Sequence, residues 1–240
     1  MSLFLSGKIA VVTGGTRGIG RAIAEALLEA GASVAVCGRT PAGVESAVAA
    51  LARKTNAAII GQAADTRNVD EIRALFQLVD REFGGLDILV NNAGVGVFGS
   101  VAELSLEDWR QTLDTNLSGV FHCCREALPR LRNRGGGFIV NIGSLAGRNA
   151  FAGGAAYNAS KFGLNGFSEA MMLDHRYDNV RVSSILPGSV ETGFGGGRSG
   201  GSSGWKIAPE DIAEVVLAVL RMPARTLVSR VEVRPSKPAR

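Results

Sequence analysis

Residues 8–20 read K-I-A-V-V-T-G-G-T-R-G-I-G, and this stretch sets the architecture of the chain. Residues 8–13 are a short apolar, β-branched run of the kind that forms a buried strand. Glycines follow at positions 14, 15, 18 and 20, and residues 21–30 have a helical pattern that ends at Gly31. Glycines at a strand-to-helix turn allow a tight bend and let the backbone approach a pyrophosphate at the helix N-terminus. The stretch therefore predicts a phosphate-binding turn between a strand and a helix.

The alternation of strand and helix continues along the chain. Further strands are expected near residues 33–37, 57–62, 86–91, 137–143, 180–186 and 227–233, and helices near 41–54, 68–83, 105–132, 155–175 and 209–221. Apolar strands that alternate with helices predict a mostly parallel sheet covered on both faces. No linker or change in composition divides the sequence. Residues 1–240 are therefore predicted to form a single, doubly wound α/β domain with a seven-stranded sheet.

Composition argues against several other classes of protein. The chain is 46% hydrophobic and 20% charged, its apolar runs are strand-sized, and its start lacks a signal-peptide pattern. We expect a cytoplasmic protein that contacts no membrane. The net charge of +4 is mild, and without a known module or interleaved aromatic residues we expect no nucleic-acid partner. Residues 235–240 are expected to be a solvated basic tail.

The cysteines are an odd set without the spacing of a metal site. Cys37, Cys123 and Cys124 are expected to be reduced and partly buried, with a redox pair at 123/124 as the alternative. Neither these residues nor the two histidines predict a metal centre. One more segment is unusual: residues 193–204 are rich in glycine and serine, which predicts either a flexible surface connection or a lid over a site.

A tyrosine and a lysine four residues apart mark the second informative stretch. Residues 155–170 read A-A-Y-N-A-S-K-F-G-L-N-G-F-S-E-A, a helical pattern that puts Tyr157 and Lys161 on one face. The lysine ammonium is expected to lower the pKa of Tyr157 from its usual value of about 10. Such a tyrosine can donate a proton to a carbonyl oxygen or accept one from an alcohol. Because Y-x-x-x-K also occurs on ordinary helix surfaces, the pair depends on its neighbours for its interpretation.

Those neighbours follow a fixed order along the chain. T-G-G-T-R-G-I-G begins at Thr13, N-N-A-G covers Asn91 to Gly94, and then come Asn116, Ser144, the Y-x-x-x-K motif and P-G at 187–188. This order resembles the classical short-chain dehydrogenases/reductases of the NADP-preferring type. The resemblance implies a Rossmann-type fold, a homo-oligomer (a dimer or tetramer), and an active site made of Asn116, Ser144, Tyr157 and Lys161. In that family the serine fixes the substrate oxygen, the lysine also binds the nicotinamide ribose, and the asparagine holds a proton-relay water.

The end of the second expected strand indicates which nicotinamide cofactor is used. Rossmann-type proteins that take NAD place an acidic residue there, whereas those that take NADP offer arginine to the 2′-phosphate. This chain has Gly38 at that position and Arg39 next to it, with Arg17 in the glycine turn as a second cation. Two guanidinium groups suit a dianionic phosphate, so NADP(H) is the expected cofactor. With the residues carried over from the family, the expected cofactor contacts are Gly14, Thr16, Arg17, Gly18, Ile19, Gly20, Arg39, Thr40, Asp65, Thr66, Asn92, Ala93, Gly94, Tyr157, Lys161, Pro187, Gly188, Val190 and Thr192.

Two of these assignments have structural alternatives. Asp65 could instead cap the helix that is expected to begin near Asn68. Asn91 and Asn92 could be ordinary turn residues rather than supports of the sheet and cofactor. The glycine-rich segment after Thr192 stands where the family carries its substrate loop, and it lacks the apolar helical stretch of many relatives. We therefore expect an open, adaptable pocket lined by residues such as Val95, Phe98, Leu145 and Phe194.

The function predicted from the sequence is reduction of a ketone or aldehyde by NADPH, or the reverse reaction, with Tyr157 as the general acid or base. One alternative within the same chemistry is reduction of a 3-oxoacyl thioester on an acyl carrier protein. A second alternative, from another class, is a non-catalytic NADP-binding sensor. Retention of all four family positions favours an enzyme that acts on a small carbonyl or alcohol substrate.

Overall fold

A computed structural model describes residues 3–55, 57–194 and 204–238. Seven strands form one sheet in the order β3-β2-β1-β4-β5-β6-β7, and every pairing is parallel. The strands are β1 (Ile9–Thr13), β2 (Ser33–Gly38), β3 (Ile59–Ala63), β4 (Ile88–Asn91), β5 (Gly137–Ile142), β6 (Val180–Pro187) and β7 (Arg230–Val233). The predicted doubly wound, seven-stranded α/β fold is confirmed, and the sheet is parallel throughout.

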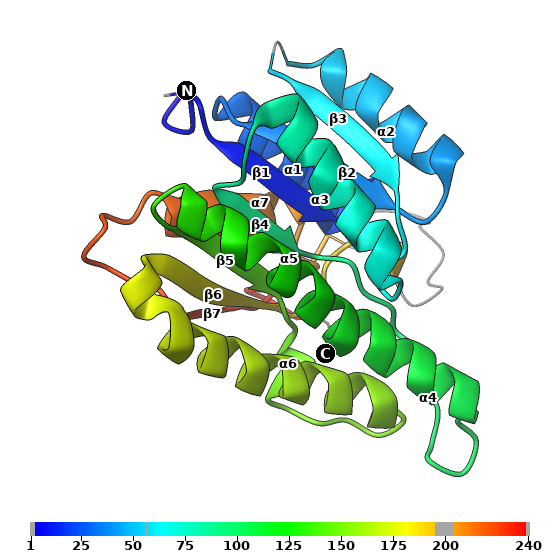
Figure 1. The fold of residues 1–240 in the computed structure, drawn as a ribbon. Coiled ribbons are helices and arrows are strands. Elements are labelled where there is room, and N and C mark those ends of the chain that lie inside the picture. Colours follow the sequence, from blue (N-terminus) through cyan, green and yellow to red (C-terminus); the bar gives the residue numbers. More distant parts are fainter. Residues whose placement is uncertain (1–2, 56, 195–203, 239–240) are drawn as a thin grey trace.

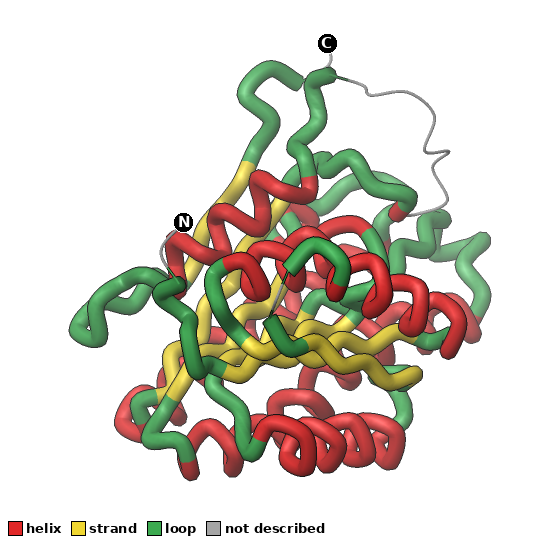
Figure 2. The backbone as a smooth tube through the Cα atoms, turned by 90° about the horizontal axis from the view of Figure 1, so that it is seen from above, coloured by secondary structure: helices red, strands yellow, loops and turns green. Residues whose placement is uncertain are grey.

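The helices cover both faces of the sheet (Figures 1 and 2). They are α1 (Gly18–Glu29), α2 (Pro41–Ala52), α3 (Val69–Phe83), α4 (Leu106–Leu113), α5 (Gly119–Asn133), α6 (Ala155–His175) and α7 (Pro209–Leu220). Side chains of α1, α2 and α7 pack with one face of the strands into a first apolar core, and those of α3, α5 and α6 pack with the other face into a second core. This burial on both faces explains why the strands are apolar along their whole length. Among the described residues, no helix is long and apolar enough to cross a membrane.

The strand order reverses beside β1, which has β2 on one side and β4 on the other. At such a switch point the connections leave β1 and β4 toward opposite faces, and a crevice opens outside their carboxyl ends. The glycine turn after β1 and the N-N-A-G segment after β4 both lie at this crevice. The topology alone therefore brings residues 13–20 and 91–94 together.

The expected helix near 105–132 consists of three parts. Between α4 and α5 lies a π-helical segment, Asp114–Ser118, which contains Asn116. A π segment breaks the regular i→i−4 bonding of the helix and is often found at functional sites. The start of α5 packs closely against Thr66, because a Cβ atom at Gly119 would lie 2.7 Å from Thr66 Oγ1.

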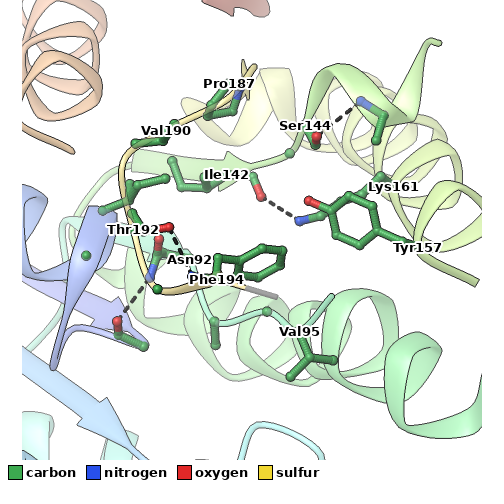
Figure 3. A pocket seen from close by; sticks show the side chains of 18 of the residues that line it. Asn92, Val95, Ile142, Ser144, Tyr157, Lys161, Pro187, Val190, Thr192 and Phe194 are labelled. Carbon is green, nitrogen blue, oxygen red and sulfur yellow. Dashed lines mark hydrogen bonds between the residues drawn. The ribbon is translucent and has the colours of Figure 1, made fainter. Parts of the chain in front are cut away.

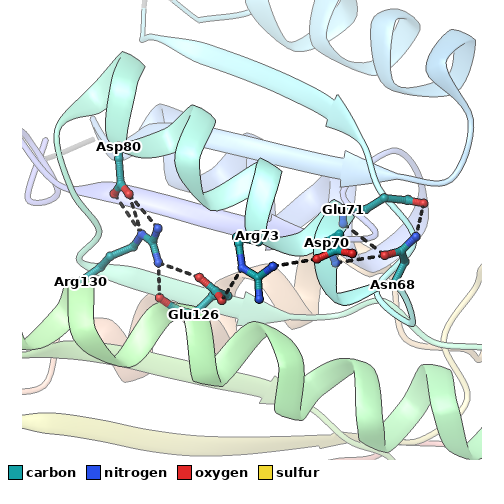
Figure 4. A network of polar contacts seen from close by, with 7 residues as sticks. All are labelled: Asn68, Asp70, Glu71, Arg73, Asp80, Glu126 and Arg130. Carbon is teal, nitrogen blue, oxygen red and sulfur yellow. Dashed lines mark hydrogen bonds and ion pairs between the residues drawn. The ribbon is translucent and has the colours of Figure 1, made fainter.

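Helices α3 and α5 are also joined by a row of charged side chains (Figure 4). Arg130 on α5 donates from Nε to both carboxylate oxygens of Asp80 on α3, at 2.9 and 3.0 Å, and pairs with Glu126 at 3.1 Å. Arg73 on α3 lies 2.7 Å from Asp70 and 3.8 Å from Glu126. Because exposed ion pairs each contribute about 0–1 kcal/mol, the row orients the two helices more than it stabilises them.

The three cysteines are free thiols in the interior. Burial raises the pKa of Cys37 to about 11 and that of Cys124 to about 12. Cys124 Sγ also accepts a hydrogen bond from Asn91 Nδ2 at 3.3 Å. The thiols are fully buried rather than partly buried as expected, and protonated thiols of this kind have little of the reactivity that a redox pair needs.

Candidate functional site

A cleft of about 1280 Å³ runs along the carboxyl ends of the strands (Figure 3). Its lining comes from the turns and loops that follow β1 to β6, together with Trp205, Lys206 and the chain after β7. Nearly all residues predicted from the sequence line it. The predicted residues outside the lining are Gly20, Thr40 and Asn116. This position, at the switch point of an open parallel sheet, is where such folds bind ligands.

The glycine turn after β1 is locked to the segment after β4. Thr13 Oγ1 accepts hydrogen bonds from the backbone N–H groups of Asn92 and Ala93, at 3.0 and 3.1 Å. In return, Asn92 Nδ2 donates to the carbonyl oxygens of Thr13 and Gly14, at 3.0 and 3.1 Å. Asn92 therefore supports the glycine turn. Asn91 points the other way, into the core, where its Nδ2 donates to Asn141 Oδ1 at 2.8 Å.

The glycines of this turn leave no space for larger residues. A Cβ atom at Gly14, whose φ is +63°, would lie 2.9 Å from Ala93 Cα. A Cβ atom at Gly20 would overlap Asn92 Nδ2 and the Gly14 carbonyl oxygen, which explains why Gly20 lies behind the turn rather than in the cleft. Helix α1 begins at Gly18 with no capping side chain among the described residues, so its first N–H groups are free to bind a ligand. These features fit the pyrophosphate of a dinucleotide.

The end of β2 favours a phosphate over a free ribose hydroxyl. A Cβ atom at Gly38 would lie 2.7 Å from Thr16 Cγ2, so an acidic side chain could be placed there only if Thr16 moved. Arg17 and Arg39 both line this end of the cleft. Thr40 is the N-cap residue of α2 and does not line it.

Asp65 and Thr66 line the same end, after β3. The Arg67 guanidinium binds the Asp65 carboxylate, with Nη2 2.6 Å from Oδ2, and holds the pKa of that carboxyl below its usual value. Asn68 caps α3, because its side chain accepts from the N–H groups of Asp70 and Glu71. The alternative that Asp65 caps this helix is therefore wrong.

Tyr157 and Lys161 come from the first two turns of α6 and face the cleft, with Ser144 opposite them after β5 (Figure 3). Lys161 Nζ donates to the Ile142 carbonyl oxygen at 3.0 Å and lies 5.8 Å from the centroid of the Tyr157 ring. Burial lowers the pKa of Lys161 to about 8. Ser144 Oγ accepts from Ala146 N at 3.1 Å, so the serine both caps a short turn and faces the tyrosine.

The expected depression of the Tyr157 pKa is wrong for this structure. The pKa of Tyr157 is raised, because burial disfavours the phenolate more than the hydrogen bond with the Ser144 hydroxyl favours it. At neutral pH the site therefore holds a protonated phenol.

Asn116 lies one layer behind the cleft, in the π-helical segment. Its Oδ1 accepts from Val95 N at 2.8 Å, and its Nδ2 donates to Val95 O at 2.9 Å and to Ser160 Oγ at 3.0 Å. A Cβ atom at Gly94 would lie 3.2 Å from Asn116 Oδ1 and 3.9 Å from Lys161 Nζ. Gly94 therefore lets the asparagine and the lysine approach each other, and the Asn116 side chain fixes the loop that carries Val95.

The segment after β6 closes one side of the cleft. Pro187, Gly188, Val190 and Thr192 all line it, and a Cβ atom at Gly18 would lie 3.2 Å from Thr192 Cγ2. Thr192 Oγ1 accepts from Phe194 N at 3.3 Å. The expected loop 193–204 lies mostly outside the described residues. In the tail, Ser236, Lys237 and Pro238 are exposed, whereas Pro235 is half-buried and packs beside Gly188; Pro235 and Pro238 also line the cleft.

All four residues predicted for the pocket wall, Val95, Phe98, Leu145 and Phe194, line the cleft. Sequence reasoning missed Asn149 and Phe151, which precede α6, and also Trp205 and Lys206. Phe151 stands two residues before Gly153 in the sequence, which indicates a loop but does not place its ring in a pocket. No spacing rule pointed to Trp205 or to the residues after β7.

A doubly wound parallel sheet with a glycine turn at its switch point is the architecture of a Rossmann-type domain. A sequence model described as short chain dehydrogenase matches residues 8–199, and the chain belongs to that family of oxidoreductases. A 3alpha-hydroxysteroid dehydrogenase of Mediterraneibacter gnavus is 35% identical over 193 residues, which cover 80% of this chain and 77% of that protein.

Two solved structures have the same fold over nearly the whole chain. A metagenomic short-chain oxidoreductase in complex with NADP is 36% identical, with a TM-score of 0.85 over 98% of this chain and 99% of that one. An alcohol dehydrogenase from Thermococcus sibiricus, complexed with 5-hydroxy-NADP, is 28% identical, with a TM-score of 0.90 over 97% of this chain and 99% of that one.

Proposed function

We propose that this protein is an NADPH-dependent oxidoreductase that reduces a ketone or aldehyde carbonyl to an alcohol, or catalyses the reverse reaction. The observation that carries the proposal is that Ser144, Tyr157 and Lys161 face one cleft whose other end is a glycine turn with two arginines. The NADP and 5-hydroxy-NADP held by two related structures support the choice of cofactor.

The residues present fit NADP(H). The turn at Gly14 to Ile19 and the start of α1 would hold the pyrophosphate, and Arg17 and Arg39 the 2′-phosphate. Asp65 and Thr66 would face the adenine, Gly94 and Lys161 the ribose beside the nicotinamide, and Val190 and Thr192 its carboxamide. When bound, the cofactor supplies the hydride for carbonyl reduction.

Ser144 and Tyr157 would both donate hydrogen bonds to the substrate oxygen and so hold the carbonyl carbon in place. The raised pKa of Tyr157 keeps its phenol protonated at neutral pH, which suits a general acid in the reductive direction. Lys161 has a pKa of about 8 and is therefore protonated at pH 7. Because this pKa lies close to the working pH, the ammonium can return a proton to the tyrosine. The opposite reaction needs the phenolate, so alcohol oxidation should increase with pH.

The test measures NADPH oxidation with a panel of ketones, aldehydes and 3-oxoacyl thioesters. The thioesters are supplied both free and bound to an acyl carrier protein. Turnover of free carbonyl compounds supports the proposal. Turnover of carrier-bound thioesters alone would favour the acyl reductase instead. Tight NADPH binding without turnover of any compound would favour the sensor.

Replacement of one hydroxyl sharpens this test. Tyr157→Phe should lower turnover by about 10²- to 10⁴-fold, the usual contribution of a general acid, while NADPH affinity stays within about threefold. Tyr177 is the chain's other tyrosine and is 92% exposed, so Tyr177→Phe is the matched control and should keep full activity. Turnover that survives in Tyr157→Phe would overturn the assignment.

The proposal includes a homo-oligomer, as expected for the family. Helix α6 carries Phe162 and Leu173 at 46% and 53% exposure, which leaves apolar surface for a second copy to cover. Light scattering at micromolar concentration should give a mass of two or four chains. A monomeric mass would contradict this part of the proposal.

A further inference from the structure

Two phenylalanines pack against the ring of Tyr157 inside the cleft, and a third packs against one of these two. The Phe98 and Phe194 rings lie 5.5 and 5.8 Å from the Tyr157 ring, centroid to centroid, and the Phe151 ring lies 5.9 Å from that of Phe98. All three line the cleft, at exposures of 48%, 47% and 43% for Phe98, Phe151 and Phe194. We call these three residues the aromatic wall. Their partly exposed faces are apolar surface, directed into a site, that a ligand can cover.

The aromatic wall is held in position by glycines. A Cβ atom at Gly96 would lie 2.6 Å from Phe194 Cε1 and 3.0 Å from Phe98 Cζ, so the absent side chain makes space for both rings. A Cβ atom at Gly154 would likewise lie 2.8 Å from Phe151 Cε2. Each ring therefore occupies space that the absence of a side chain on a neighbouring glycine leaves open.

Backbone contacts tie the loops of the wall to each other and to the catalytic helix. Gly99 N donates to the Gly153 carbonyl oxygen at 2.8 Å, which joins the loop of Phe98 to that of Phe151. Asn158, the residue after Tyr157, donates to Ala146 O at 2.6 Å, and its Oδ1 accepts from Phe151 N at 3.4 Å. These contacts hold the loops that carry Phe98 and Phe151 beside the start of α6, where Tyr157 lies.

The charge of the site limits what the wall can bind. Aromatic faces attract cations, but the Lys161 ammonium already lies 5.8 Å from the Tyr157 ring centroid and would repel a second cation placed among these rings. The phenylalanine rings offer neither hydrogen-bond donors nor acceptors. They favour another uncharged aromatic ring, which packs at centroid separations of about 4.5–7 Å.

We propose that the aromatic wall recognises an aryl group of the substrate, so that the preferred substrates are uncharged ketones that carry an aromatic ring. This inference depends on the proposed function, because it takes the Tyr157 hydroxyl as the partner of the substrate oxygen. With the oxygen held there, the arm of the substrate that passes the tyrosine ring meets Phe98 and Phe194 first and Phe151 beyond them.

The experiment compares 1-phenylpropan-2-one with 1-cyclohexylpropan-2-one. The two ketones have similar size and unconjugated carbonyls of similar reactivity, so they differ mainly in the aromatic character of the ring. The wild type should prefer the phenyl compound by about tenfold in kcat/KM, as expected for one or two aromatic pairs. Phe98→Leu, Phe151→Leu and Phe194→Leu should each reduce that preference about threefold, because leucine keeps the apolar contact and removes the ring.

The control variant is Phe121→Leu. Phe121 is 46% exposed, like the residues of the wall, but lies on α5 outside the cleft lining, so its replacement should leave the preference unchanged. Binding of both ketones to the Tyr157→Phe variant, followed by saturation-transfer NMR, gives a second readout that does not require turnover. It should show the same order of preference.

The outcomes separate this inference from the proposed function. Turnover of both ketones without a phenyl preference would overturn the aryl site and leave the reductase intact. Preferential binding of the phenyl ketone, lost in the wall variants but without turnover, would support the aryl site and count against the reductase. Absence of both binding and turnover for these ketones would contradict the aryl site.

Discussion

The two ends of the cleft differ in whether backbone or side chains form their walls. The end that includes the glycine turn is shaped mainly by backbone and glycines, with the side chains of Arg17 and Arg39 beside them, and Gly14 and Gly20 contact neighbouring residues too closely to carry a side chain. The end beside Tyr157 is made of side chains, several of them aromatic and partly exposed. A wall of backbone fixes one ligand shape, whereas a wall of side chains can change with single substitutions. Substitutions at the first end should therefore have larger and less selective effects than those at the second.

The largest effect is expected for Gly20→Ala. The new methyl group would displace the Asn92 amide, which donates to the carbonyl oxygens of Thr13 and Gly14. Overpacking and the loss of these bonds should lower the free energy of unfolding by about 2–4 kcal/mol. NADPH affinity, measured by calorimetry at a temperature where the variant is folded, should decrease by about 100-fold, equivalent to about 2.7 kcal/mol.

Gly166→Ala is the matched control for this prediction. Gly166 lies within α6, and a Cβ atom there meets nothing within 4 Å outside its own helix backbone. Alanine should stabilise the helix by about 0.5–1 kcal/mol and leave NADPH affinity unchanged. If Gly20→Ala is no more harmful than Gly166→Ala, the turn is not the tightly packed element described above.

The next largest effect is expected for Arg39→Asp, which changes a side chain at the backbone-built end. The change would remove the charge-assisted hydrogen bond that we propose Arg39 makes to the 2′-phosphate, and it would add a repulsive carboxylate, so the KM for NADPH should increase by about 100-fold. The KM for NADH should change little. Arg53→Asp, which alters the net charge equally at the exposed end of α2, is the control. An unchanged ratio of NADPH to NADH efficiency would contradict the assignment of the phosphate site.

The sequence predicted the first end of the cleft better than the second. Close backbone packing requires glycine at given spacings, so positions 14, 18 and 20 were recognisable from their spacing after an apolar strand. The strands were predictable for a similar reason, because burial on both faces requires continuous apolar runs. Phe151 and Pro235 carry no such requirement, since many side chains can line a pocket, and only the fold shows that they reach it.

Electrostatics were the hardest part to predict. Helical spacing correctly put Tyr157 and Lys161 on one face, but the sign of the tyrosine pKa shift depends on burial, which outweighs the hydrogen bond with Ser144. The π-helical segment around Asn116 was equally hidden, because α4 and α5 on either side of it follow ordinary helical patterns. Both features arise from tertiary packing, which one sequence does not reveal.

The burial of Lys161 gives a prediction for stability against pH. Its pKa is lowered from 10.5 to about 8 in the folded protein, so between these values the unfolded chain binds a proton that the folded chain does not. Stability from this group therefore increases with pH across that window, by about 1.4 kcal/mol per pH unit. Denaturant unfolding should be measured for wild type and Lys161→Met. The free energy of unfolding of wild type, relative to that of the variant, should increase from pH 8 to pH 10. A constant difference would mean that the lysine is not desolvated.

The smallest effect is expected at the side-chain end, for Gly96→Ala. The added methyl group meets Phe194 Cε1 at 2.6 Å and Phe98 Cζ at 3.0 Å, and both atoms belong to rings on loops that can move by a few tenths of an ångström. The KM for 1-phenylpropan-2-one should increase about threefold to tenfold, whereas the KM for a small ketone such as butan-2-one should stay constant.

Gly99→Ala is the control for this change, because the nearest atom to a Cβ at Gly99 lies at 3.8 Å. Equal effects of Gly96→Ala on both ketones would mean that the wall acts as general packing rather than as an aryl site. A hundredfold effect would remove the contrast between the two ends, since it would make the substrate end as intolerant as the glycine turn. A small, ring-selective change is the result that a wall of adjustable side chains requires.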